Sequence, residues 1–183
     1  MAWRVVTFST ESLDSACKRL EQLVASTGYE PDCVLGIKTG GWEVAKLMWV
    51  GRRHEFVTVQ RPSTKNKGAL FTKLMRCLPY PVLDFLRKLE ARILSLRKPS
   101  KVAAEEILLP DLSGVERLII IDDAVDSGST LKSVFDAVRE ALPHADVLSA
   151  VITLTRRDAI FKPDFALYND QTLIRFPWSK DYK

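Results

Sequence analysis

One short segment constrains the fold of this chain more than any other. Four large apolar residues, Leu118 to Ile121, are followed at once by two carboxylates, Asp122 and Asp123. A continuous apolar run that ends at turn-forming residues predicts a strand buried in a parallel sheet. Open α/β sheets bind their ligands at the carboxyl ends of such strands, so we expect the acid pair to lie at a binding site.

The next residues are small or carry hydroxyl groups, and they lead into a predicted helix from Leu131 to Leu142. In such a turn, backbone N–H groups and hydroxyls can point at a phosphate, and the start of the helix adds partial positive charge. The carboxylates can accept hydrogen bonds from sugar hydroxyls. Residues 122–130 therefore predict a site for a phosphorylated sugar. The alternative is an ordinary strand–turn–helix in which the acids cap the helix.

The whole run from Leu118 to Leu131 resembles the signature with which type I phosphoribosyltransferases bind phosphoribosyl pyrophosphate (PRPP). The resemblance implies that Asp122 and Asp123 contact the ribose and Mg²⁺, and that the following loop holds the 5′-phosphate. The other residues it implies in this part of the substrate site are Ala124, Val125, Asp126, Ser127, Gly128, Ser129 and Thr130. Ala124 departs from the family, in which a larger aliphatic residue is usual.

A second motif, Gly36 to Gly41, follows a predicted strand and opens a predicted helix. Backbone amides at such a place can face an anion, and glycine permits close approach. By itself, a glycine turn between a strand and a helix is usually only a turn. In the order of the type I family, however, it occupies the place of the pyrophosphate loop. The resemblance thus implies a pyrophosphate site formed by Lys38, Thr39, Gly40 and Gly41.

The resemblance also indicates where an acceptor base would bind. Type I enzymes for 6-oxopurines carry an acid four positions after the first acid of the pair, which is Asp126 here, and we expect it to act as a general base or proton shuttle. Arg156 aligns with a lysine that contacts the exocyclic oxygen, and arginine is not a neutral exchange. Leu173, followed by Ile174, aligns with the stacking aromatic of the family's hood, and leucine provides apolar contact without ring stacking.

Strand and helix patterns alternate along the chain. We expect strands at residues 3–8, 32–37, 55–60, 117–122 and 145–155, and helices at 10–26, 40–50 and 131–142. With 183 residues and 46% hydrophobic content, this predicts one α/β domain around a doubly wound, mainly parallel sheet. The resemblance adds a small hood of N- and C-terminal segments, with residues 156–183 as the C-terminal part. Within it, we expect Trp178 to be a core residue without a base contact.

Residues 61–116 comprise a flexible loop and a basic helical insertion, and residues 69–110 depart from the compact members of the family. A polar, basic loop at 61–68 stands where the family has a mobile lid, although an ordinary exposed loop is an equal alternative. From Pro81 onward an apolar stripe predicts an amphipathic helix. Between Arg61 and Lys101, eleven Lys and Arg stand against two acids, a net charge of +9, so the rest of the chain carries −5 of the total of +4.

Three interpretations of this basic insertion compete. We favour an extra helical layer or a dimer face, to which a steering field for a polyanionic substrate can add. Contact with nucleic acid or a membrane stays open but is least favoured, because the sequence contains no recognisable nucleic-acid module.

The cysteines and the first residues of the chain indicate the cellular compartment in which the protein is expected. Cys17, Cys33 and Cys77 are scattered, odd in number and without metal-binding spacing, which fits free thiols in a reducing cytosol. The start lacks the layout of a signal peptide, and no apolar run reaches membrane-spanning length. A cytoplasmic protein is therefore expected.

The expected function is transfer of a 5-phosphoribosyl group from PRPP to a purine base, with Mg²⁺ as cofactor and release of pyrophosphate. The expected acceptor is a 6-oxopurine, namely guanine, xanthine or hypoxanthine. Two alternatives stay open: a PRPP-binding regulatory protein of the same fold, and an enzyme with a non-standard acceptor, which Leu173 and the long insertion make credible. A homodimer is expected by analogy with the family.

Overall fold

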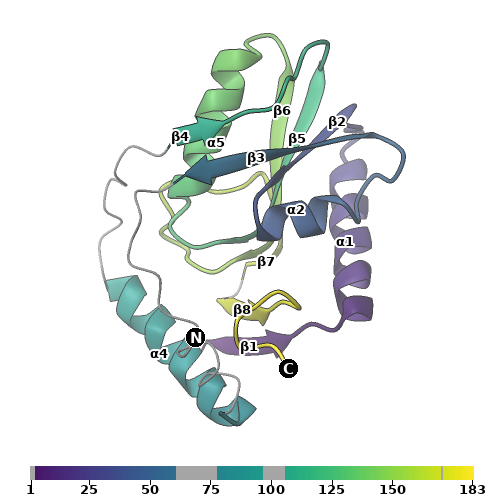
Figure 1. The fold of residues 1–183 in the computed structure, drawn as a ribbon. Helices are drawn as coiled ribbons and strands as arrows, with labels where there is room; N and C mark the ends of the chain where they lie inside the picture. Colours follow the sequence, from purple (N-terminus) through teal and green to yellow (C-terminus); the bar gives the residue numbers. More distant parts are fainter. Residues whose placement is uncertain (1–2, 61–77, 97–105, 170) are drawn as a thin grey trace.

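The structure, a computed structural model, describes residues 3–60, 78–96, 106–169 and 171–183. Its centre is a sheet of six strands in the order β4-β3-β2-β5-β6-β7 (Figure 1). Strand β4 runs antiparallel to β3, and the other neighbours run parallel. The strands are β2 (Cys33–Ile37), β3 (Arg53–Gln60), β4 (Glu106–Leu108), β5 (Arg117–Val125), β6 (Asp146–Leu154) and β7 (Phe165–Tyr168). This confirms the predicted α/β class with a mainly parallel sheet.

Helices cover both faces of the sheet, as the apolar run in β5 predicts. Ile119 and Ile121 pack with α1 (Thr10–Ala25) and α2 (Gly40–Ala45) on one face. Leu118 and Ile120 pack with α5 (Ser129–Ala141) on the other. Because neighbouring residues of a strand point to opposite faces, a strand buried on both sides must be apolar at every position.

The ends of the helices follow from local sequence. Ser9 caps α1, since its side chain accepts a hydrogen bond from the Ser12 N–H. Helix α2 ends at Ala45 rather than near residue 50 as the sequence predicted. Trp49, with a φ of 45°, lies in the left-handed region, which a right-handed helix cannot include.

A second, smaller sheet forms the hood. Strands β1 (Arg4–Thr7) and β8 (Thr172–Arg175) pair in parallel, although they come from opposite ends of the chain. The predicted strand at residues 3–8 thus belongs to the hood rather than to the central sheet. Strand β7 comes from the same C-terminal segment as β8 but completes the edge of the central sheet beside β6.

The helix predicted in the insertion is α4 (Tyr80–Leu96), which lies beside the hood (Figure 1). Its Leu83 is fully buried. Its outward side exposes apolar side chains, 37–64% accessible: Val82, Phe85, Leu86, Leu89 and Ile93. The loop at residues 61–68 and Cys77 lie outside the described residues, so the lid stays a prediction.

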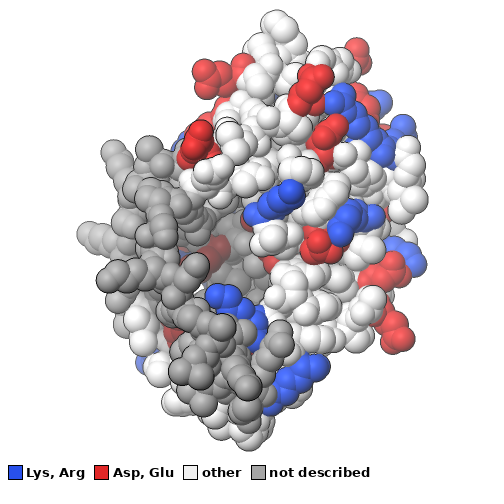
Figure 2. Space-filling model, in the orientation of Figure 1, with Lys and Arg blue, Asp and Glu red and all other residues white. Residues whose placement is uncertain are grey.

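Two observations concern the charge and the apolar character of the described residues. On the face shown in Figure 2, basic and acidic side chains are intermixed rather than gathered into a basic patch over the described residues. Within the described ranges, no helix combines the length and apolar character needed to cross a membrane.

Candidate functional site

Two loops meet at the carboxyl edge of the central sheet. Strands β2 and β5 are parallel neighbours, so the glycine loop after Ile37 comes to lie against the acid pair near the end of β5. Beside them is a cavity of about 370 Å³. Its lining residues are Asp122, Ala124, Val125, Asp126, Ser127, Gly128, Ser129, Thr130 and Leu131. The structure thus brings the glycine loop and the acid pair together at one edge of the sheet.

The small-residue loop that lines the cavity has a defined shape. Gly128 has a φ of +81°, and a Cβ at this position would overlap the Phe161 carbonyl. The Ser127 carbonyl accepts a hydrogen bond from the Ile160 N–H at 2.8 Å, and the Ser127 and Ser129 hydroxyls are 3.0 Å apart. The segment after β6 therefore braces the loop from behind, and Gly128 is required by both its dihedral and its close contact.

The glycine loop lies directly on the acid pair. A Cβ at Gly40 would overlap the Asp123 carboxylate, and a Cβ at Gly41 would lie 2.8 Å from the Asp122 Cα. Both positions therefore need glycine. The side chains of Lys38 and Thr39 are exposed next to the loop. The Lys38 ammonium sits 3.2 Å from the centre of the Phe56 ring.

The two acids differ in their surroundings. Asp122 lines the cavity, whereas Asp123 lies behind it under the glycine loop. The Trp178 indole N–H donates to Asp123 Oδ2 at 2.9 Å, and the Ala124 N–H donates to Oδ1 at 2.9 Å. Burial raises the pKa of Asp123 even though these hydrogen bonds oppose the shift.

Trp178 is half-buried and stacks on Phe176, with ring centres 4.9 Å apart. It packs against the core, as expected, but its contact with Asp123 is a feature that sequence reasoning missed. The Pro177–Trp178 pair was the available signal, but nothing in the spacing connects it with a residue 55 positions earlier.

Asp126 is exposed, and its carboxylate accepts a hydrogen bond from a residue at the end of the neighbouring strand. The Thr155 hydroxyl donates to Asp126 Oδ1 at 3.0 Å and also lies 3.2 Å from the Val125 carbonyl. Sequence reasoning did not select Thr155, although a hydroxyl residue directly after a predicted strand was a usable signal.

Arg156, the next residue, is 5% exposed and is held by Asp158. Its Nε and Nη2 donate to the two carboxylate oxygens at 2.9 and 2.7 Å. The hydrogen bond to Asp158 raises the pKa of Arg156, and the charge of Asp126 adds to this effect. The arginine thus remains positively charged near Asp126, in a fixed orientation.

The remaining predicted residues lie in the hood. Leu173 is half-buried on β8, and the Ile174 side chain is buried in the core. Neither lines the cavity between Asp122 and Leu131. Any contact between Ile174 and a ligand would therefore come from its main chain.

Comparison with known proteins gives matches at the level of structure. No protein-family model matches the sequence, and no curated protein matches it either. The chain is similar to the xanthine-guanine-hypoxanthine phosphoribosyltransferase of Helicobacter pylori, with a TM-score of 0.67, 16% identity, and 96% of this chain and 94% of that one covered. It is also similar to a purine phosphoribosyltransferase from Pyrococcus horikoshii, with a TM-score of 0.60, 18% identity and coverage of 96% and 94%.

A third structure is that of a hypothetical protein from Neisseria gonorrhoeae with bound ppGpp. Its TM-score is 0.60 and its identity 15%, with 97% of this chain and 90% of that chain covered. Similarity that spans nearly the full length, at this level of identity, establishes the fold. The chain has the type I phosphoribosyltransferase fold. This confirms the resemblance seen in residues 118–131.

In this phosphoribosyltransferase fold, the expected cofactor is Mg²⁺. Magnesium prefers oxygen ligands and is usually held by one or two carboxylates together with substrate phosphates and water. Asp122, at the cavity wall, fits that donor set, and Asp123 lies directly behind it. Among the residues that the structure describes, no group of three or more His, Cys, Asp or Glu side chains forms a metal cluster.

Proposed function

We propose that this protein transfers a 5-phosphoribosyl group from PRPP to a purine base and releases pyrophosphate. One observation carries the proposal. The glycine loop at Gly40–Gly41 lies on the acids Asp122 and Asp123, beside a cavity lined by Ser127 to Thr130. Each part of PRPP then has a complementary surface: the loop and cavity for its phosphates and Asp122 for its ribose hydroxyls.

The chain's own residues would act mainly by positioning and by accepting a proton. The cavity holds the 5′-phosphate, and Asp122 accepts hydrogen bonds from the ribose, which fixes the anomeric carbon. The bond from this carbon to the pyrophosphate oxygen breaks as a bond to a ring nitrogen of the base forms, through an oxocarbenium-like state. Mg²⁺, bound through Asp122 and the substrate, would neutralise charge on the departing pyrophosphate.

Asp126 would take the proton that the base loses. Thr155 donates to Oδ1 of this carboxylate, which keeps the group oriented and leaves Oδ2 for the base. Arg156, held by Asp158, supplies N–H donors for an exocyclic oxygen, which favours a 6-oxopurine. Leu173 supplies apolar contact from the hood. A homodimer and a cytoplasmic location are part of this proposal.

The deciding experiment measures pyrophosphate release from Mg²⁺–PRPP, with guanine, xanthine, hypoxanthine and adenine tested separately. We expect release that depends on one or more 6-oxopurines and little with adenine, which lacks the exocyclic oxygen. Release with adenine alone would contradict the role of Arg156. No release with any purine, despite PRPP binding, would contradict transfer to a purine and would favour a regulatory protein or a non-standard acceptor.

A regulatory nucleotide-binding protein is the second candidate. The observation in its favour is that the Asp123 carboxylate is already engaged by Trp178 and Ala124. The neighbour from Neisseria gonorrhoeae, which has bound ppGpp, shows that this fold can hold a phosphorylated nucleotide. Binding of PRPP or a purine nucleotide without turnover would favour this candidate.

A further inference from the structure

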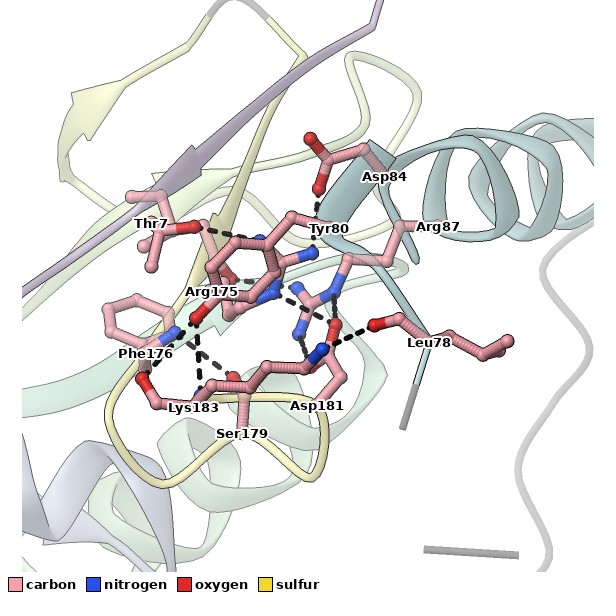
Figure 3. A network of polar contacts seen from close by, with 11 residues as sticks. Thr7, Leu78, Tyr80, Asp84, Arg87, Arg175, Phe176, Ser179, Asp181 and Lys183 are labelled. Atoms are coloured by element: carbon pink, nitrogen blue, oxygen red, sulfur yellow. Dashed lines mark hydrogen bonds and ion pairs between the residues drawn. The ribbon is translucent and has the colours of Figure 1, made fainter. Parts of the chain in front are cut away.

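A buried polar cluster joins the insertion helix α4 to the hood (Figure 3). At its centre is Arg175, at the end of β8, with 1% of its surface exposed. Its guanidinium donates to Asp181 at 2.9 Å, to Asp84 at 2.7 Å and to the Thr7 hydroxyl at 2.7 Å. The Tyr80 ring lies 4.6 Å from the guanidinium carbon. Four parts of the chain therefore meet on one side chain: β1, α4, β8 and the C-terminal tail.

Arg87 makes a second connection from the same helix. Its Nε and Nη2 donate to the two oxygens of Asp181 at 2.8 and 2.5 Å, and its Nη1 donates to the main-chain carbonyl of Ile174 at 3.0 Å. Helix α4 therefore bonds directly to the backbone of β8. Bidentate arginine–carboxylate pairs impose direction as well as attraction, so they set position more strictly than apolar packing does.

The charges of the cluster balance. Two arginines, Arg87 and Arg175, face two acids, Asp84 and Asp181. Burial by itself would raise the pKa of Asp181, but the hydrogen bonds from the two arginines lower it to about 2. Asp181 is therefore ionised at neutral pH and faces both arginines as a carboxylate there.

The strand that this cluster fixes is the one that carries the proposed base contacts. Ile174, whose carbonyl accepts from Arg87, follows Leu173 directly. The same segment continues to Trp178, which bonds to Asp123 beneath the glycine loop. A shift of β8 would thus change the position of the hood relative to the bound base. The phosphate cavity would change less, because it is built on β5 and braced by residues 160–161.

We propose that α4 positions the hood for the acceptor base, with Arg87 and Asp84 as its positioning residues. This inference rests on the proposed phosphoribosyl transfer, and it assigns the insertion a role in that reaction. The basic helix then acts through two specific residues on its inner side, and the other charges of the insertion are not needed for this role.

The test compares Arg87→Met with Lys88→Met. Both variants remove one positive charge from α4, but Lys88 is exposed, whereas Arg87 bonds to the backbone of β8. Steady-state kinetics give KM for the base and KM for PRPP separately. In Arg87→Met we expect KM for the base to rise about tenfold, with KM for PRPP within about twofold of wild type. Lys88→Met should match wild type in both constants.

Two further variants keep the test decisive. Arg87→Lys retains the charge but cannot span Asp181 and the Ile174 carbonyl together, so it should restore only part of the affinity for the base. Asp84→Asn removes the negative charge from one partner of Arg175 and weakens that contact. The Asp84 side chain is 34% exposed, so this variant should fold even if Arg87→Met does not. Asp84→Asn should show the same selective rise in KM for the base. Its melting temperature is measured to show that the variant is folded.

The outcomes separate this inference from the proposed function. If wild-type protein transfers no phosphoribosyl group to any purine, the function is overturned and this inference falls with it. If wild type is active but folded Arg87→Met and Asp84→Asn leave both KM values unchanged, or change both equally, the inference alone is overturned.

Discussion

At the residue scale, the two carboxylates Asp122 and Asp126 face the cavity and Asp123 does not. Asp126 is exposed, with Thr155 bonded to one of its oxygens. Asp123 is instead covered by the glycine loop and held by Trp178. Three acids within five positions of one motif therefore occupy three different environments.

Asp126→Asn tests the proton acceptor. The amide keeps the shape of the side chain but cannot accept the proton, so we expect PRPP binding to persist while turnover falls about 10²–10⁴-fold. Calorimetry with Mg²⁺–PRPP and a kcat measurement check the two parts. Asp136→Asn, which changes an exposed acid of α5 paired with Lys132, is the control and should be silent. Equal loss of binding and turnover would make Asp126 a phosphate-loop residue instead.

Trp178→Phe tests the contact with Asp123. The ring can still stack on Phe176, but the N–H donor is lost and Asp123 keeps its charge in a buried place. We expect the free energy of unfolding to fall by about 1–3 kcal/mol at neutral pH. The fall should be smaller in acid, because loss of the donor raises the pKa of Asp123 further and protonation removes the penalty. Denaturant unfolding at both pH values measures this.

Trp42→Phe is the matched control for that variant. The Trp42 ring also packs against another aromatic, Phe56, although edge-on rather than stacked, and it lies on α2. It should show no such dependence on pH. A loss of stability in Trp178→Phe that is the same at both pH values would assign Trp178 to packing alone.

At the scale of single elements, α4 and β8 show how polar contacts replace apolar ones. The outer side of α4 exposes apolar side chains. The inner side buries Leu83 and also makes a network of contacts between arginines and acids. Strand β8 is only four residues long, and Thr172 to Arg175 pair with β1 alone along the whole strand. Such a short pair depends on what packs against it.

Asp181→Asn tests that dependence through pH. Because the folded-state pKa of Asp181, about 2, is below its ordinary 3.8, its ionised form contributes stability above pH 4. That contribution is lost as pH falls through about 2. The variant should lose about 1–2 kcal/mol at pH 7 and show a flatter decline between pH 4 and pH 2. Asp14→Asn, an exposed acid of α1 paired with Lys18, serves as the control. Parallel declines in wild type and Asp181→Asn would contradict the cluster's role.

At the scale of the whole molecule, substrate binding should stabilise the fold. A ligand present at about 100 times its dissociation constant adds about 2.7 kcal/mol, which for a chain of this size raises Tm by about 5–10 °C. We expect Mg²⁺–PRPP to do this and EDTA to reverse most of it. Asp122→Asn should abolish the shift while leaving Tm without ligand nearly unchanged. A shift that persists in EDTA would show binding that does not need the metal.

Much of the molecule was predictable from sequence because its signals are local. Fourteen consecutive residues predict the strand, its burial and the edge at which a ligand binds. They are the apolar run at 118–121, the acids after it and the small-residue loop. The stripe after Pro81 predicted α4 for the same reason. The early end of α2 was not predictable, because the apolar pattern continues while the backbone changes to tighter turns, in which the Leu47 and Met48 N–H groups donate to the Val44 and Ala45 carbonyls.

The sequence by itself determined the α/β class, the alternation of strands and helices along the chain and the PRPP-like motif. These follow from hydrophobic periodicity and turn chemistry, which act over a few neighbouring residues. The tertiary structure alone decided which acid faces the cavity, that Thr155 orients Asp126, and that α4 is fastened to the hood through Arg87 and Arg175. Those contacts join residues 29 to 91 positions apart, and only the packing of finished elements brings them together.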